Sequence, residues 1–198
     1  MKLLAFVDLH GSLSMIKKIA STVKKEDVDC IICAGDVTIF GDSMKQLVRK
    51  LDGIGPTVFM LHGNHEDRIS LKRACENTKN VKFMHKAVFE TDEYVIMAYG
   101  GGGFSTKDAE FEKWTKEAMK TIGKDKKIIL VTHAPPYGTK LDLILDQPAG
   151  NKSIRAFIEK EKPVLAISGH LHENSYVKDK IGKTIIVNPG PGGMVFEV

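Results

Sequence analysis

The chain has 198 residues, of which 42% are hydrophobic and 27% are charged, and its net charge is +4. A chain of this length buries about 70% of its unfolded surface in one domain and needs no disulfide to do so. The composition argues against a disordered protein and a membrane protein, and so small a positive excess neither requires nor excludes nucleic-acid binding. We therefore expect residues 1–198 to form a single domain.

The opening stretch MKLLAFVD is interrupted at Asp8 after five apolar residues. This is shorter than the apolar region of a secretory signal, and no run approaches the ~18 residues of a membrane span. We interpret the stretch as a first strand and expect no membrane partner. The absence of a targeting segment and the odd set of three cysteines predict a cytoplasmic protein.

Cys30 and Cys33 form a C-x-x-C pair, which in other settings is a redox or zinc motif. Both residues fall within a predicted strand. Residues three apart in a strand face opposite sides of the sheet, so the two thiols cannot meet. We expect both cysteines to be structural.

The period of the apolar residues predicts an alternation of strands and helices in the first part of the chain, with Ser12 or Ser14 as the first helix cap. The predicted strands here are 2–8, 29–35 and 57–61, and the helices are 12–25, 42–51 and 66–77. Later strands are expected at 81–84, 87–91, 94–100, 127–133, 164–170, 175–179, 183–188 and 193–198, with helices at 107–122 and 153–162 and a long loop at 134–150. This pattern predicts an α/β fold of two packed sheets with helices outside.

Five predicted strands end in side chains that can bind a metal, in the segments FVDLH, CAGD, LHGNH, VTH and ISGHLH. The candidates are Asp8, His10, Asp36, Asn64, His65, His133, His170 and His172. The carboxyl ends of strands in α/β sheets form ligand sites, so these ends can build one site. In extended backbone, residues two apart such as Asp8 and His10, or His170 and His172, point to the same side.

The number of candidates indicates two ions, because a single catalytic zinc uses about three protein ligands. If the Asp36 carboxylate bridges the ions, one takes Asp8, His10, Asp36 and His172, and the other takes Asp36, Asn64, His133 and His170. Two divalent ions with only two carboxylates leave a positive pocket that suits phosphate esters. Ions about 3.5–4 Å apart can hold a bridging hydroxide and clamp the oxygens of an in-line displacement at phosphorus.

The motifs DLHG, GD, GNHE, TH and GHLH, in this order, resemble those of the calcineurin-like metallophosphoesterases. The resemblance runs from Asp8 to His172 and continues into IIVNPG. It implies a four-layer α/β/β/α sandwich without a cap domain, a dinuclear metal centre and the ligands assigned above. It also implies that His65, the candidate left over by the count, stabilises the transition state and protonates the leaving oxygen.

The chain departs from the family's protein phosphatases in the segment GDVTIFGD, where Ile39 and Phe40 stand in place of an aspartate and an arginine. That aspartate orients the catalytic histidine and that arginine grips phosphate. The variant is more similar to the family's small phosphodiesterases. A second departure is Pro191, which follows NPG where serine is common.

For several further residues the sequence gives less specific expectations. We expect His62 to pack at a strand end, His85 to lie on the surface, and the run Gly100–Gly103 to form a flexible loop at the pocket rim. Arg68 either reaches a substrate phosphate or is solvated. Tyr137 and Asp142 are candidates for shaping substrate entry.

We expect a phosphodiesterase that uses a metal-bridging hydroxide, with a phosphomonoesterase as the alternative. A different class of alternative is a non-catalytic metal-binding scaffold, since fold alone does not establish activity and the resemblance extends to a retromer subunit without catalytic machinery. The mixed nitrogen and oxygen ligands suit Mn, Fe, Ni, Co or Zn. A small phosphate ester is the expected substrate, nucleic acid has no specific support, and the oligomeric state stays open.

Overall fold

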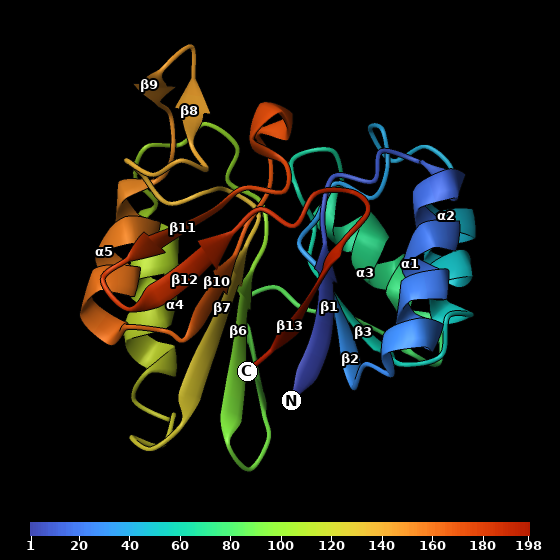
Figure 1. Ribbon diagram of the computed structural model, residues 1–198, viewed down its shortest axis with the longest axis horizontal. Helices are drawn as coiled ribbons and strands as arrows, with labels where there is room; N and C mark the ends of the chain where they lie inside the picture. The colour runs from blue at the N-terminus through green and yellow to red at the C-terminus, as the bar shows by residue number, and fades with distance from the viewer.

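Two mixed β-sheets lie face to face in the computed structural model, which describes residues 1–198 (Figure 1). The first sheet has the strand order β13-β1-β2-β3-β4 and is parallel except for β13. Its strands are β1 (Lys2–Phe6), β2 (Cys30–Cys33), β3 (Thr57–Met60), β4 (Val81–Phe83) and β13 (Met194–Glu197). The last strand of the chain therefore returns to pair with the first.

The second sheet has the order β11-β12-β10-β7-β6-β5, with antiparallel strands at both edges and parallel strands between them. Its strands are β5 (Ala87–Glu90), β6 (Tyr94–Tyr99), β7 (Lys127–Thr132), β10 (Leu165–Ile167), β11 (Lys178–Ile181) and β12 (Thr184–Val187).

Helices cover the outer face of each sheet, so the molecule has four layers in the order α/β/β/α (Figure 1). The first sheet carries α1 (Leu13–Glu26), α2 (Met44–Asp52) and α3 (Arg68–Glu76), and the second carries α4 (Ala109–Ala118) and α5 (Lys152–Glu161). The predicted sandwich is confirmed. None of these helices is long and apolar enough to cross a lipid bilayer.

Three separate apolar cores hold the layers together, one between the two sheets and one beneath each set of helices. Cys30 lies in the core between the sheets, whereas Cys33 lies under the helices of the first sheet. The two thiols therefore face opposite sides, as predicted, and both are free and buried.

Strand register brings the ends of the strands to one level. Phe6 pairs with Cys33 and Cys33 pairs with Met60, so the first three strands end side by side. In the second sheet Val131 pairs with Ile167. The loops that follow these five strands consequently meet at one edge of the sandwich.

Local structure differs from the predictions in a few places. Ser12 is the N-cap of α1 and accepts a hydrogen bond from the Met15 backbone N–H, which settles the choice between Ser12 and Ser14. The helix expected at 107–122 is shorter because α4 ends at Ala118 in a series of turns. The long loop contains the hairpin of β8 (Leu143–Ile144) and β9 (Gln147–Pro148), and a short 3₁₀ turn, His172–Asn174, precedes β11.

Candidate metal centre

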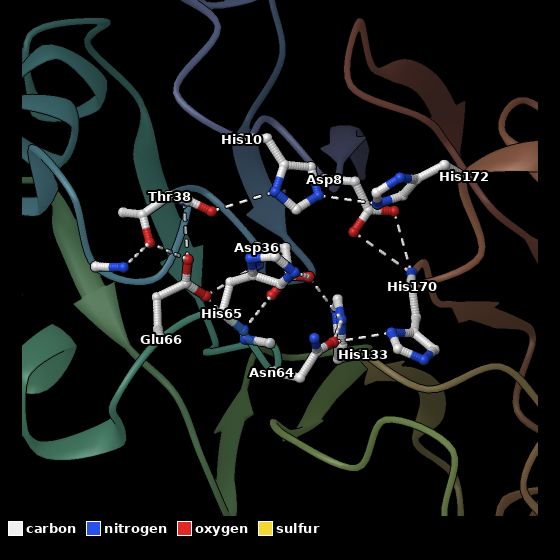
Figure 2. Close-up of polar contacts among 12 residues, drawn as sticks. Asp8, His10, Asp36, Thr38, Asn64, His65, Glu66, His133, His170 and His172 are labelled. Carbon is white, nitrogen blue, oxygen red and sulfur yellow. Dashed lines mark hydrogen bonds and ion pairs between the residues drawn. The ribbon is translucent and has the colours of Figure 1, made fainter.

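All eight candidate side chains meet at the edge where the strands end (Figure 2). Their ligand atoms form three groups, and the atoms of each group all lie within 4.8 Å of one another. The groups are Asp8 with His10 and His172, His10 with Asp36 and His65, and Asp36 with His133 and His170. Asn64 joins the third group through its side-chain oxygen. Donors from both sheets thus converge on one place.

The first group is built around two imidazoles. His10 Nε2 lies 2.8 Å from His172 Nε2. The other nitrogen of His10, Nδ1, is 3.2 Å from the Thr38 carbonyl oxygen, which can only accept a hydrogen bond. A neutral His10 therefore carries its proton on Nδ1 and directs the Nε2 lone pair into the site, as metal-binding histidines do.

The third group is oriented in the same way. His133 is fully buried and its Nδ1 donates to the Ala34 carbonyl at 2.9 Å. Asn64 Oδ1 lies 2.9 Å from His133 Nε2 and 2.8 Å from His170 Nδ1. A cation among these atoms would satisfy all three, so the donor chemistry fits a metal ion.

Asp36 lies between the groups and is 1% exposed. Its Oδ1 accepts a hydrogen bond from the His65 backbone N–H at 2.9 Å, and its Oδ2 is 3.3 Å from His133 Nε2. Burial by itself would raise the pKa of Asp36, but without a metal ion the hydrogen bond and charge of a protonated His133 outweigh burial and lower it to about 2. Asp36 is therefore a carboxylate at neutral pH, the form that binds a cation.

The surrounding groups have pKa values set mainly by burial. Burial raises the pKa of Asp8 to about 6, although the charge of His133 opposes this. Burial and the nearby His133 lower the pKa of His170 to about 4. A histidine with a low pKa is neutral at pH 7, and the neutral imidazole is the form that binds metal.

The backbone of the site is left-handed rather than extended. Asp8, His10, Asp36 and His170 have φ values of 56°, 43°, 52° and 73°. The expectation that His170 and His172 point to one side is wrong, because the turn sends His170 to the third group and His172 to the first. Such backbone is costly for residues other than glycine, and it is concentrated at functional sites.

Two glycines allow the loops to approach closely. Gly35 has a φ of +101°, and a Cβ there would lie 2.7 Å from the backbone nitrogen of Gly63. A Cβ on Gly63 would lie against the Asp36 carboxylate. Alanine at either position would push apart the loops after β2 and β3.

Glu66 is a site residue for which the sequence predicts no role. It is 6% exposed and its oxygens accept hydrogen bonds from the backbone N–H groups of Asp36, Thr38 and Gly63. The only signal in the sequence is its place directly after His65 in GNHE. It acts by fixing the loops that carry the candidate ligands.

The predictions for two histidines behind the site have different outcomes. His62 is buried at the end of β3 and packs against Phe83 and His85, which confirms its packing role. His85 is half-buried rather than on the surface, and its Nδ1 accepts a hydrogen bond from the Gly100 backbone N–H at 3.1 Å. The prediction for His85 was wrong because this side chain packs against His62 and Tyr99 and bonds to Gly100.

The remaining candidates lie around the edge. Arg68 is exposed at the start of α3 and lines a hollow that contains none of the eight side chains. Tyr137 is half-buried, with the Lys152 ammonium 4.7 Å from its ring centre. Asp142 is fully buried and accepts backbone hydrogen bonds within its own loop, so it shapes the loop and does not face the site.

Residues 1–174 match the family model described as calcineurin-like phosphoesterase. The chain belongs to this family. Calcineurin-like phosphoesterases are metal-dependent hydrolases of phosphate esters, and the match includes every segment that contributes to the cluster of histidines, aspartates and Asn64. The motif resemblance is thereby confirmed.

This phosphoesterase is similar to one curated protein and to several solved structures. An uncharacterized protein of Methanocaldococcus jannaschii, MJ1162, is 32% identical over 203 residues, which covers 96% of this chain and 88% of that protein. The crystal structure of TT1561 of Thermus thermophilus has a TM-score of 0.78 at 16% identity, covering 96% of this chain and 90% of that chain. A structure described as a novel archaeal phosphodiesterase has a TM-score of 0.56 at 17% identity, covering 96% of this chain and 84% of that chain. At these identities, the two solved structures are similar in fold.

Proposed function

We propose that this calcineurin-like phosphoesterase is a phosphodiesterase that holds two divalent metal ions and shares Asp36 between them. One ion would take Asp8, His10, Asp36 and His172, and the other would take Asp36, Asn64, His133 and His170. The support is that the first and third groups have no residue in common, while His10 and Asp36 each lie in two of the three groups. Of these two, only the Asp36 carboxylate has two oxygens to share. A single ion uses fewer ligands than the eight side chains that meet here.

When bound, the two ions would supply Lewis-acid activation of water and neutralise charge on the phosphate during in-line displacement. Manganese is the ion that we propose to test first, and Fe, Ni, Co and Zn are compatible with the same mixed ligands. Three free and buried cysteines are compatible with a reducing compartment, and we propose a cytoplasmic location. The proposed unit is the single domain of residues 1–198, without a cap.

His65 would protonate the leaving oxygen. Its Nε2 is 3.9 Å from Asp36 Oδ2, its backbone N–H is bonded to Asp36 Oδ1, and its side chain is 21% exposed. The imidazole therefore stands beside the proposed bridging ligand with access to a substrate. A histidine in this position can give a proton to the departing alkoxide as the bond to phosphorus breaks.

The surroundings of His65 favour a diester over a monoester. Phe40 stacks on the His65 ring at 4.3 Å, in the segment where the family's protein phosphatases carry an arginine. No hydrogen bond or ion pair joins an arginine or lysine side chain to any of the eight candidates. A monoester brings a second negative charge that a cation would stabilise, whereas a diester brings an organic group that an apolar ring can contact.

The test is to strip the protein of metal, add manganese and compare hydrolysis of bis(p-nitrophenyl) phosphate with that of p-nitrophenyl phosphate. We expect metal-dependent cleavage with a higher kcat/KM for the diester. A preference for the monoester would favour the phosphomonoesterase. Two bound ions with no turnover of either ester would favour the non-catalytic scaffold.

A further inference from the structure

Two large aromatic side chains are exposed beside the candidate metal centre. Phe40 is 80% exposed and Phe104 is 64% exposed, and each contacts a histidine of the site. A single exposed apolar residue is common on protein surfaces. Two exposed rings that both contact the same polar site require a more specific explanation.

Phe40 lies almost parallel to His65, with ring centres 4.3 Å apart and an angle of 25° between the planes. One face of Phe40 is therefore covered by the imidazole, while its high exposure leaves the other face open. The open face can stack with another flat ring, an arrangement that aromatic rings favour at this distance. If His65 protonates the leaving oxygen, a group bonded to that oxygen could reach the open face of Phe40 around the edge of the ring.

Phe40 also forms part of the wall of a hollow between α2 and α3. The hollow has a volume of about 960 Å³ and is otherwise mainly polar, with Gln46, Arg73 and Asn77 among its lining residues. Its size falls within the range of small-molecule sites. A leaving group with a ring on Phe40 would have room and hydrogen-bonding partners for its polar substituents there.

Phe104 occupies the other side of the site. Its ring meets His170 edge to face, with centres 4.5 Å apart and an angle of 64°. The preceding glycines Gly102 and Gly103, with φ values of +111° and +59°, turn the loop toward this histidine. The rim loop predicted from the glycine run therefore places an aromatic ring beside the site.

His65 and His170 lie on opposite sides of Asp36 and His133 (Figure 2). A phosphate bound between the two proposed ions would thus have one exposed phenylalanine toward each of its ester arms. Phe40 would be near the arm that leaves, and Phe104 near the arm that is retained. One flat ring beside each arm suits two compact flat groups better than a long alkyl chain.

We infer that Phe40 and Phe104 are specificity residues that stack with aromatic rings on the two ester arms of a phosphodiester. This inference rests on the proposed phosphodiesterase activity. The substrate class is a diester with an aromatic ring close to the phosphate on at least one arm, either an aryl group or a heteroaromatic base. Aromatic contacts of this kind change binding by about 3- to 10-fold.

The retained arm is tested with two substrates that share one leaving group, p-nitrophenyl phenyl phosphate and p-nitrophenyl methyl phosphate. Phe104→Ala is expected to lower kcat/KM for the phenyl ester by about 3- to 10-fold more than kcat/KM for the methyl ester. Phe40→Ala is expected to lower both by a similar factor, and Phe40→Trp to restore them. Phe89→Ala, which removes an exposed phenylalanine from the edge strand β5, is the matched control and should change neither.

Binding without turnover provides a second readout. The manganese-loaded protein is expected to bind phenylphosphonate about 3- to 10-fold more tightly than methylphosphonate, and the double variant Phe40→Ala/Phe104→Ala should lose this preference. Both side chains are exposed, so thermal unfolding of the variants should match that of the wild type.

The outcomes separate the inference from the proposed activity. If the wild type cleaves both diesters but Phe104→Ala lowers both equally or neither, the inference is wrong and the activity stands. If neither diester is cleaved but phenylphosphonate binds preferentially through the two rings, the inference on ring recognition stands and the proposed activity is wrong. If there is neither turnover nor a preference for phenylphosphonate, both are wrong.

Discussion

The Glu66 carboxylate accepts a hydrogen bond from the backbone N–H of Asp36 at 3.0 Å. The same oxygen accepts from the Gly63 N–H at 3.0 Å, and the other oxygen accepts from the N–H and hydroxyl of Thr38, each at 2.8 Å. One buried carboxylate therefore ties the loop after β2 to the loop after β3. These loops carry Asp36 and Asn64, so Glu66 holds two candidate ligands in place through the backbone of their loops.

Replacing Glu66 with glutamine should weaken metal binding. The new amide NH₂ donates where one carboxylate oxygen accepted. Either the N–H groups of Asp36 and Gly63 or the N–H of Thr38 therefore lose their acceptor, and the Asp36 loop shifts. We expect manganese affinity to fall by about 10- to 100-fold, as when partners of metal ligands are removed elsewhere. Isothermal titration calorimetry checks this, with the exposed Glu76→Gln on α3 as control. An unchanged dissociation constant of manganese from Glu66→Gln would contradict this role of Glu66.

Removing individual candidate ligands should change the number of bound ions in a specific pattern. His10→Ala removes one imidazole that the second proposed ion does not use, so we expect one ion per chain instead of two. Asp36→Asn weakens the ligand that both proposed ions share and should reduce the content of both. Elemental analysis after dialysis measures these ratios. Retention of both ions by Asp36→Asn would show that Asp36 is not the bridge.

The effect of losing His65 on the rate should depend on how much the leaving group needs a proton. We expect His65→Ala to slow cleavage of diphenyl phosphate more than that of bis(p-nitrophenyl) phosphate, because phenol is the weaker acid and its anion leaves less readily. General acid catalysis contributes about 10²- to 10⁴-fold when the proton is required. The kcat values of the two esters and the metal content are measured together. Loss of an ion from His65→Ala would identify His65 as a ligand instead.

His85 should make stability depend on pH. Burial and the charges of Lys86 and Arg68 lower its pKa to about 4, from an ordinary value of 6.5. The unfolded chain therefore takes up the proton at higher pH than the folded chain, so this contribution to stability is full above pH 6.5 and is lost as the pH falls toward 4. Protonation also removes the acceptor for the Gly100 N–H.

The variant His85→Asn keeps a hydrogen-bond acceptor and does not titrate. We expect the free energy of unfolding of the wild type to fall between pH 7 and pH 5 by about 1 kcal/mol more than that of the variant, a value reduced for the partial exposure of His85. Urea denaturation of the metal-stripped proteins measures the difference. Equal slopes for both proteins would rule out His85 as the source.

Strand–helix alternation and the placement of Asp8, Asp36 and His133 could be predicted because each depends on local sequence. The period of the apolar residues identifies the strands, and residues directly after parallel strands meet at one edge of the sheet. The left-handed turns at Asp8 and His170 could not be predicted, since nothing in these residue types requires positive φ. They exist because the loops from two sheets must converge.

The contacts of Glu66, Phe40 and Phe104 depend on tertiary structure. Glu66 binds backbone groups of a loop that lies 28 to 30 residues earlier in the sequence. Phe40 is recognisable in the sequence as a departure from the protein phosphatases, yet its stacking on His65 follows only from the fold. The hairpin of β8 and β9 escapes prediction because its strands are only two residues long.

A two-ion centre that hydrolyses phosphodiesters should gain its activity in step with the binding of metal. The most direct test is to titrate manganese into metal-stripped protein by calorimetry while following hydrolysis of bis(p-nitrophenyl) phosphate at each addition. We predict saturation at two ions per chain, with diester cleavage that rises fully only as the second ion binds. Saturation at one ion with full activity, or two bound ions without any cleavage, would contradict the claim.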